Sequence, residues 1–540
     1  MKRLVISAYC LVLSALCTNV LAVPAWPGPH TRTLPDGTQQ TYYVHGDEFF
    51  HWTSPSTEAI MTPEQEMRYA AAPHKSAHRM PAEIGTPYLP KKGLVILVNF
   101  KDVKFKKENT RAQMDSMCNG LNYTYGGAYK SAAQYFSDQS NGQYCPKFDV
   151  IGPVELDSCY AYYGKNNTSG NDRYMADVVI EACRRAKAQY PSLNFANYAQ
   201  HKASEVDFVF LFYAGYGENE TYDDDHDRLW PLQWTVDEAC QYGYKSTRFT
   251  KDSAKIDGVK INMFAYTNEL QYYNNDARCG IGTLCHEFGH VLGLADYYNT
   301  VGSSYYANIP NNWHIMCKGC YNDNGNLPPS YGPFEKFFFK WITPIQLQDS
   351  QTVTLPAGGN TCAYMTEHNT VWSTPIQHDD STVFYFENRQ QTGWDAASHE
   401  LNGHGLLIWR VIFNKRMWEE NTPNNNQQAL RITIIPSSKE NKIKNNNDDT
   451  YPGTYQVTDR QIFDSRSIVN IAENNGSITF TTTPQGITAL PSIPDDRHRL
   501  SGDPYALTPK KYLLNNQIII SIDEKTSVNI GTGTLLRSGK

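Results

Sequence analysis

The chain has 540 residues with 48 basic and 55 acidic side chains, a formal net charge of −7. This mild acidity, without a basic block, argues against nucleic acid or an anionic membrane as the main partner. Hydrophobic residues make up 40% and charged residues only 19%, which excludes a wholly disordered chain. Beyond the N-terminus no apolar run reaches the roughly 18 residues of a membrane helix, which excludes a polytopic membrane protein.

Residues 1–22 have the features of a secretory signal peptide. A basic start (MKR) precedes a short apolar stretch and a small-residue cleavage site that ends at Ala22. We therefore expect a secreted protein, extracellular or on a bacterial cell surface, whose mature chain begins at Val23. An uncleaved anchor is the alternative, although the apolar stretch is short for one.

Ten cysteines follow this leader. An even number in an exported chain suggests that some form disulfides, although the sequence does not give their pairing. Cys317 and Cys320 make a single C-x-x-C, and a zinc ribbon would need two such pairs. We interpret this one as a local loop feature or a disulfide.

The region after the leader is irregular and rich in Pro. Residues 70–87 are rich in small residues and Pro, which is typical of an exposed linker. We interpret residues 23–85 as a pro-segment with its processing site in this linker. The alternative is a small N-terminal domain that stays attached.

The middle of the chain alternates strand and helix patterns. The runs GLVILVNF (93–100) and VDFVFLFYAGYG (206–217) predict buried strands, because they are short, continuous and apolar. Between them, residues 174–190 have apolar side chains at helical spacing. This order predicts an α/β domain, to which we assign residues 86–345.

Beyond residue 345 the pattern changes to short β-type runs separated by Asn, Gly and Pro clusters. We expect a β-rich domain with a β-sandwich-like fold over residues 346–500. Residues 501–540 are then a short β-type tail. The Asn-rich stretches of this region, such as NTPNNNQQ, are interpreted as polar loops.

The sequence His286-Glu287-Phe288-Gly289-His290 is an H-E-x-x-H pattern. On a helix, positions i and i+4 share a face, so both imidazoles can reach one metal ion. Glu287 can then reach a metal-bound water without binding the metal itself. Apolar neighbours such as Leu284 and Val291 would bury this helix, which disfavours a solvated face with two unrelated histidines.

A catalytic zinc usually has three protein ligands and a water, so a third ligand is needed. Between His290 and Glu335 the sequence contains no Glu. Gly293, three residues after His290, can end the helix and turn the chain back. Asp296 then follows in a position to bind through a carboxylate oxygen, giving H-E-x-x-H-x-x-G-x-x-D.

This extended pattern resembles the metzincin metallopeptidases and, within them, the immune-inhibitor-A-like (M6) family. Asp296 stands where metzincins usually have a third His. The sequence WHIMCKG (313–319) is similar to the family's Met-turn, with Met316 as the floor beneath the metal. The likeness covers most of residues 40–455 and implies a metzincin-like α/β (α+β) catalytic domain with one catalytic Zn²⁺. Lys318 departs from the Tyr found there in many metzincins, so the oxyanion-stabilising residue is unassigned.

We therefore expect a secreted, zinc-dependent endopeptidase, made as a zymogen and monomeric, that acts on proteins or peptides. Glu287 would be the general base that activates the zinc-bound water. A rival from another class is a secreted binding protein or adhesin with a structural metal site and a ligand-binding β-domain. The presence of Glu287 disfavours such an inert descendant, and the extended pattern disfavours an amidase for another bond type.

Three further features leave alternatives open. The run DDDHD (223–227) could bind Ca²⁺, but a solvated acidic loop is favoured, so any calcium site stays unknown. Asp47 and Glu48 could cap the zinc in the zymogen, and a plain packing role suits them equally well. Tyr297, Tyr298 and His314 lie close to the pattern and are expected to be structural.

Overall fold

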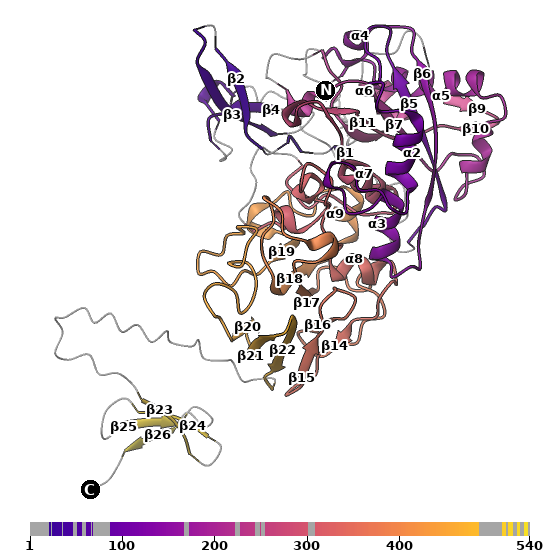
Figure 1. The fold of residues 1–540 in the computed structure, drawn as a ribbon. Coiled ribbons are helices and arrows are strands. Elements are labelled where there is room, and N and C mark those ends of the chain that lie inside the picture. The colour runs from indigo at the N-terminus through magenta and orange to yellow at the C-terminus, as the bar shows by residue number, and fades with distance from the viewer. Residues whose placement is uncertain are drawn as a thin grey trace, which may run out of the picture. The chain divides into compact units, whose positions relative to one another are not determined.

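The structure is a computed structural model of the 540-residue chain, drawn in Figure 1. It forms two compact units, residues 1–489 and 490–540. It describes residues 21–22, 24–26, 28–34, 36–46, 51–56, 61–65, 67, 87–166, 172–221, 227–242, 249, 254–300, 308–484, 510–514, 517–521, 526–529 and 534–537. Within these ranges no helix is long and apolar enough to cross a bilayer.

A six-stranded sheet forms the centre of the region predicted to be α/β, which confirms a mixed α/β fold. Its strand order is β1 (Leu21–Ala22), β8 (Leu232–Thr235), β11 (Met263–Asn268), β7 (Val209–Tyr213), β5 (Lys92–Asn99) and β6 (Lys147–Glu155). The last four are mutually parallel, whereas β8 runs antiparallel to β11, and β1 runs antiparallel to β8. The two strands predicted from apolar runs are β5 and β7.

Helices cover both faces of this sheet, which explains why β5 and β7 are apolar without alternation. In β5, Leu94 and Ile96 belong to one hydrophobic cluster and Val95 and Leu97 to the other, because neighbouring side chains point to opposite faces. One face carries α4 (Tyr160–Gly164), α5 (Met175–Gln189) and α6 (Val236–Tyr242), and the other α2 (Arg111–Asn119), α3 (Ala132–Gln139) and α7 (Gly282–Val291). The helix predicted over residues 174–190 is α5.

Two β-hairpins and a three-stranded sheet complete the N-terminal half. The hairpins are β9 (Lys255–Ile256) with β10 (Val259–Lys260), and β12 (Leu270–Gln271) with β13 (Ala277–Arg278). The three-stranded sheet consists of β2 (His30–Thr33), β3 (Gln39–Gly46) and β4 (His51–Ser54), all within the predicted pro-segment.

After α8 (Pro333–Phe338), two sheets share a hydrophobic cluster. One has the order β14 (Ile345–Gln346), β16 (Cys362–Thr366), β17 (Thr382–Arg389), β18 (Gly405–Ile412) and β19 (Ile432–Ile434). The other has the order β15 (Thr352–Leu355), β22 (Ser477–Thr482), β21 (Arg466–Asn474) and β20 (Arg460–Phe463). A short helix, α9 (Lys415–Glu419), follows β18.

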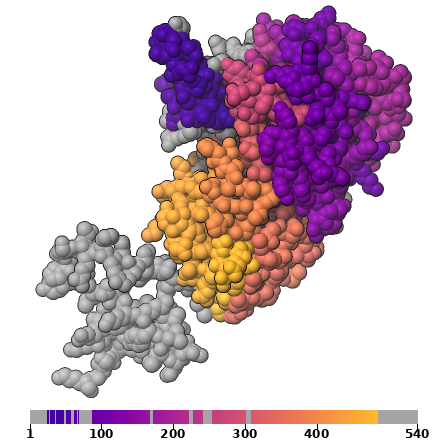
Figure 2. Space-filling view, in the orientation of Figure 1, coloured from indigo at the N-terminus to yellow at the C-terminus, as the bar shows by residue number. Residues whose placement is uncertain are grey.

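The α/β region and the first of these sheets share one hydrophobic core. The same cluster contains Phe288 of α7, Phe334 of α8 and Trp409 of β18. In the space-filling view of Figure 2, the surfaces of these regions meet without a gap. The second unit is a four-stranded antiparallel sheet of β23 (Lys510–Leu514), β24 (Gln517–Ser521), β25 (Thr526–Asn529) and β26 (Thr534–Arg537).

The expected disulfides are not formed. All ten cysteines after the leader lie in the described residues, and each is a free thiol. Most are buried, where a thiol packs like a small apolar side chain. Cys320 Sγ lies 3.4 Å from the carbonyl oxygen of Cys317, so the C-x-x-C is a local loop feature.

Candidate metal centre

Helix α7 carries the H-E-x-x-H pattern in the buried position that its apolar residues predict. Phe288 contacts the rings of Phe136, Phe148 and Phe208, at centroid distances of 5.2, 5.2 and 5.7 Å. His286 and His290 lie one turn apart and have no solvent exposure. Packing of Phe288 against α3 and the sheet therefore fixes the direction in which the two imidazoles point.

The helix ends by the turn that Gly293 predicts. Gly293 has a φ of 100°, a left-handed conformation that favours glycine. The amide of Leu294 donates back to Gly289 O at 3.0 Å, and the amide of Gly293 donates to His290 O at 3.0 Å. This reversal brings Asp296 to the face of α7 that carries the histidines.

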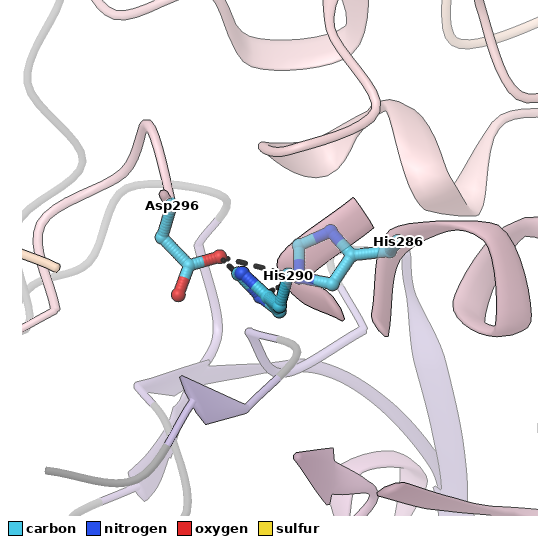
Figure 3. A group of neighbouring side chains, drawn as sticks. All are labelled: His286, His290 and Asp296. Carbon is cyan, nitrogen blue, oxygen red and sulfur yellow. Dashed lines mark hydrogen bonds and ion pairs between the residues drawn. The ribbon is translucent and has the colours of Figure 1, made fainter. Parts of the chain in front are cut away.

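The three predicted ligands meet at one point, as Figure 3 shows. His286 Nε2 lies 3.3 Å from His290 Nε2, and Asp296 Oδ1 lies 3.2 and 3.4 Å from these two nitrogens. All three side chains have 0% exposure. Among the residues that the structure describes, no other group of three or more His, Cys, Asp and Glu side chains is arranged to hold a metal ion.

These separations fit a metal ion of the size of zinc. Ligand atoms around a tetrahedral ion with bonds of about 2.0–2.1 Å are about 3.3–3.4 Å apart. His286 Nδ1 lies 2.8 Å from Ile315 O, and His290 Nδ1 lies 2.8 Å from Leu294 O. Each Nδ1 therefore carries the proton and each Nε2 offers a lone pair toward Asp296 Oδ1, which accepts no hydrogen bond. Three buried atoms with lone pairs therefore face one another without a proton between them. A cation can bind such a set of ligand atoms.

The electrostatics of the group agree with this donor set. Burial lowers the pKa of His290, which keeps the imidazole neutral and able to bind a metal. Burial acts to raise the pKa of Asp296, but positive charge next to it, from a protonated ring or from a cation bound in the same place, outweighs burial and lowers the pKa. Asp296 is therefore a carboxylate at neutral pH.

Met316 lies beneath the helix, as the resemblance to a Met-turn implies. A Cβ atom added to Gly289 would lie 2.7 Å from Met316 Sδ, so this close approach favours glycine in the middle of the pattern. The neighbouring Ile315 carbonyl accepts from His286, and the Met316 carbonyl accepts from the amide of Tyr297 at 2.8 Å. The turn thus holds both the helix and the segment that carries Asp296.

His314 and Tyr297 both contact Glu335 of α8. The Met316 amide donates to His314 Nδ1 at 3.0 Å, and His314 Nε2 lies 3.1 Å from Glu335 Oε2. The Tyr297 hydroxyl donates to Glu335 Oε1. Burial acts to raise the pKa of Glu335, but His314 and Tyr297 outweigh it and lower the pKa, so the carboxylate is ionised. These contacts support the backbone beneath the metal centre.

Glu287 follows the first ligand on α7 and has no solvent exposure. It is not one of the three side chains whose ligand atoms converge. In an H-E-x-x-H pattern the residue at this position follows the first ligand in the sequence and is not itself a ligand.

Asn421, between α9 and β19, contacts the third ligand and was not predicted. Its Nδ2 donates to Asp296 Oδ2 at 2.7 Å, and its Oδ1 accepts from the Asp296 amide at 2.6 Å. The only sequence signal was the Asn-rich stretch in which it lies, which we had interpreted as a polar loop.

The N-terminal segment, residues 24–56, lies against the same region. Trp26 stacks on Tyr273 at a centroid distance of 3.5 Å, and the Tyr321 hydroxyl donates to Pro24 O at 2.6 Å. Just before it, β1 pairs with β8, and both strands contact α7. A cavity of about 690 Å³ lies between this segment and the rest of the first compact unit, lined among others by His45 and Lys318.

Lys318 stands at the position where many metzincins have a tyrosine. Burial lowers the pKa of its ammonium to about 8, and the side chain lines the 690 Å³ cavity. Asp47 and Glu48 lie outside the described residues, as do residues 223–226 of the acidic run, so the capping and calcium hypotheses stay open.

Comparison with known proteins agrees with the pattern. The sequence model of the family described as "Immune inhibitor A peptidase M6, catalytic domain" matches residues 88–343. Immune inhibitor A of Bacillus thuringiensis subsp. alesti is 26% identical over 235 residues, which are 40% of this chain and 32% of that protein. The pre-pro-metalloprotease PrtV of Vibrio cholerae serotype O1 is 24% identical over 303 residues, 49% of this chain and 32% of that protein. The chain thus spans about a third of the length of these curated relatives.

Proposed function

Residues 88–343 belong to the immune inhibitor A (M6) family of metallopeptidases, and from this premise we propose that the chain is a secreted zinc endopeptidase made as a zymogen. Its substrates are proteins or peptides, and it acts as a monomer. The observation that carries the proposal is the donor set of His286, His290 and Asp296, with separations of 3.2–3.4 Å.

The chemistry divides between the metal and the protein. A zinc ion held by these three side chains would supply a Lewis acid that polarises the scissile carbonyl and makes the attacking water acidic. Glu287 takes the proton of that water as general base and then returns it to the leaving amine. The Asp296 carboxylate and the Nε2 atoms of the two imidazoles would hold the ion, and the backbone carbonyls bound to each Nδ1 fix the orientation of the rings.

We also propose the finer description of the architecture. The α/β region of residues 86–345 is a metzincin-like catalytic domain, supported by the Met316 turn beneath α7. Residues 346–500 form a β-sandwich-like domain, supported by the hydrophobic cluster that its two sheets share. Residues 501–540 are a short β-type tail, and residues 1–22 are the signal peptide.

The zymogen proposal is supported by where the N-terminal segment lies. Strand β8 is next to the edge strand β1, which lies in the proposed signal peptide, and it becomes the edge strand with unpaired backbone groups once β1 is removed. Such an edge can take an extended peptide as an added strand. Because β8 contacts α7, a substrate strand on this edge would pass close to the metal ligands. The N-terminal segment lies against the same region through Trp26, which stacks on Tyr273, and Pro24 O, which accepts from Tyr321, so we expect its removal to allow substrate access.

The processed protein should hydrolyse casein, and removal of the metal should abolish this activity. Trypsin can separate the segment at Lys75 or Arg79 of the linker. Release of acid-soluble peptide is then compared for the full chain, the processed chain and the processed chain with 1,10-phenanthroline. The non-chelating 1,7-phenanthroline is the control. Undiminished hydrolysis by protein shown to have lost its metal would refute the proposed chemistry.

Acid should loosen the N-terminal segment. His30 and His45 are buried in it, and burial lowers the pKa of each from 6.5 to about 4. Both rings take up a proton more readily when the segment is undocked than when it is docked. The contribution of the neutral rings to docking is therefore complete above pH 6.5 and is lost as the pH falls toward 4. A protonated His45 would also add a positive charge near Lys318, which itself lowers the pKa of His45.

Hydrogen exchange of residues 30–54, corrected for the intrinsic pH effect, measures this loosening between pH 7 and pH 5. A variant with both His30→Gln and His45→Gln should lose the pH dependence. Equal protection of the wild-type segment at both pH values would contradict the expectation.

A further inference from the structure

The carboxamide of Asn421 makes two hydrogen bonds to a single residue, the third ligand Asp296. It donates to Oδ2 at 2.7 Å and accepts from the backbone amide at 2.6 Å. Asn421 is 1% exposed and Asp296 is fully buried, so water does not compete for these bonds. With Oδ2 held in this way, Oδ1 is the oxygen that faces the two histidines.

Asparagine suits this position in two respects. Its side chain offers one donor and one acceptor, which match the carboxylate and the amide of an aspartate. Its backbone has a φ of 51°, a left-handed conformation in which asparagine is enriched. A leucine or alanine could make neither hydrogen bond and disfavours the left-handed backbone. An ionised aspartate would place a second negative charge against Oδ2.

The carboxamide is held firmly because the helix before it is anchored. Trp418 of α9 is 2% exposed and packs against Phe413 and Phe334, at centroid distances of 5.2 and 5.7 Å. The Asn421 amide donates to Trp418 O at 3.1 Å. The position of Asn421 is therefore set by packing and not by its contact with Asp296 alone.

The same loop, residues 421–425, also holds the chain that follows Asp296. Thr300 Oγ1 donates to Asn421 O at 3.0 Å, and the Thr300 amide donates to Asn425 Oδ1 at 2.8 Å. Asn424 Nδ2 donates to Tyr297 O at 2.8 Å. Three residues of the loop thus fix both ends of the segment 296–300.

We propose that Asn421 is a positioning residue of the metal centre, through which the β-rich region orients a ligand of the set that lies within the M6 catalytic domain. The carboxamide holds Asp296 so that Oδ1 binds the metal and Oδ2 does not. This inference rests on the proposed function, because it requires a metal at His286, His290 and Asp296. It adds a requirement that lies 78 residues beyond the end of the family match at residue 343.

A positioning role and a purely structural role lead to different results. If Asn421 only stabilises the fold, its loss lowers the stability of the metal-free protein and leaves metal affinity unchanged. If it positions Asp296, its loss weakens metal binding, and the effect disappears once Asp296 itself has been removed. Partners of metal ligands typically contribute about 10- to 100-fold to metal affinity.

The test measures zinc affinity of the full chain by competition with a chromogenic chelator. Asn421→Gly removes the side chain but tolerates the left-handed backbone, and Asn421→Asp keeps the size but loses the donor. The matched control is Asn441→Gly, at an exposed asparagine with a φ of 50°. We expect both Asn421 variants to bind zinc about 10- to 100-fold more weakly, and the control to bind as wild type does.

Two further measurements separate the outcomes. In cobalt-substituted protein, the visible spectrum of Asn421→Gly should shift toward that of Asp296→Ala. Combining Asn421→Gly with Asp296→Ala should add no further loss of affinity, because Asn421 acts through Asp296. An unchanged cobalt spectrum and wild-type zinc affinity in both Asn421 variants would overturn this inference alone. Failure of wild-type protein to bind zinc would instead overturn the proposed function.

Discussion

Replacing Glu287 with glutamine should lower the rate of peptide hydrolysis by about 10²–10⁴-fold, the usual contribution of a general base. The side chain is fully buried on α7 beside His286, and it is not one of the three converging ligands. Glutamine keeps its size and can still form hydrogen bonds, but it cannot take a proton from water. The loss should therefore appear in kcat, with zinc content unchanged.

The measurement is casein or peptide hydrolysis by processed wild-type and Glu287→Gln protein, with bound zinc determined in both. His290→Ala is the comparison variant, since it should lose activity together with zinc. If Glu287→Gln keeps more than a tenth of the wild-type rate with zinc bound, Glu287 is not the base. If processed, zinc-loaded wild type shows no activity on any protein, the binding-protein alternative is favoured.

Local sequence patterns were enough to predict the helix of the metal centre and the segment that follows it. The i, i+4 spacing of His286 and His290 predicts one shared face, and Gly293 predicts the reversal that brings Asp296 back. Each of these features depends on residues fewer than about a dozen positions apart. The strands β5 and β7 likewise need only a short, continuous run of apolar residues to be recognised.

The remaining contacts could not be predicted because they join segments far apart in the sequence. Asn421 meets Asp296 across 125 positions, and no periodicity or spacing rule connects them. The pairing of β1 with β8 likewise joins segments about 210 residues apart. It depends on the order of the strands in the sheet, which local sequence patterns do not give. The disulfide prediction was wrong because cysteine number and export are statistical guides, whereas the core of this chain packs its thiols as apolar groups.

A buried ion-pair network joins the β-rich region to the chain that leads into α8. Arg389 of β17 is 1% exposed; its Nη1 lies 2.6 Å from Asp395 Oδ1, and its Nε lies 3.0 Å from Glu387 Oε1. Its Nη2 donates to the carbonyl oxygens of Ser330 and Tyr331 at 2.9 and 3.3 Å. The two carboxylates raise the pKa of the guanidinium against the opposing effect of burial, so it is charged.

Replacing Arg389 with methionine should lower the free energy of unfolding of the first compact unit by about 3–5 kcal/mol, the cost of leaving a buried charge without its partner. Methionine has a similar length, so little of the loss comes from an empty volume. Glu387 would keep its bond from Trp409 Nε1 at 2.7 Å, and Asp395 its bond from the Ser330 amide at 3.0 Å, with the buried Lys336 as the remaining cation that interacts with both carboxylates.

Urea unfolding followed by tryptophan fluorescence measures the change, with Arg416→Met as the matched control. Arg416 pairs with Glu420 on the exposed face of α9, where such a pair contributes little. A loss no larger than that of the control would mean that water or neighbouring residues compensate Glu387 and Asp395. Arg389 also binds the backbone just before α8, and α8 carries Glu335. Its loss should therefore also weaken the contact between Glu335 and His314. Zinc affinity should therefore fall in Arg389→Met but not in Arg416→Met, which ties the metal centre to the shared core of the two regions.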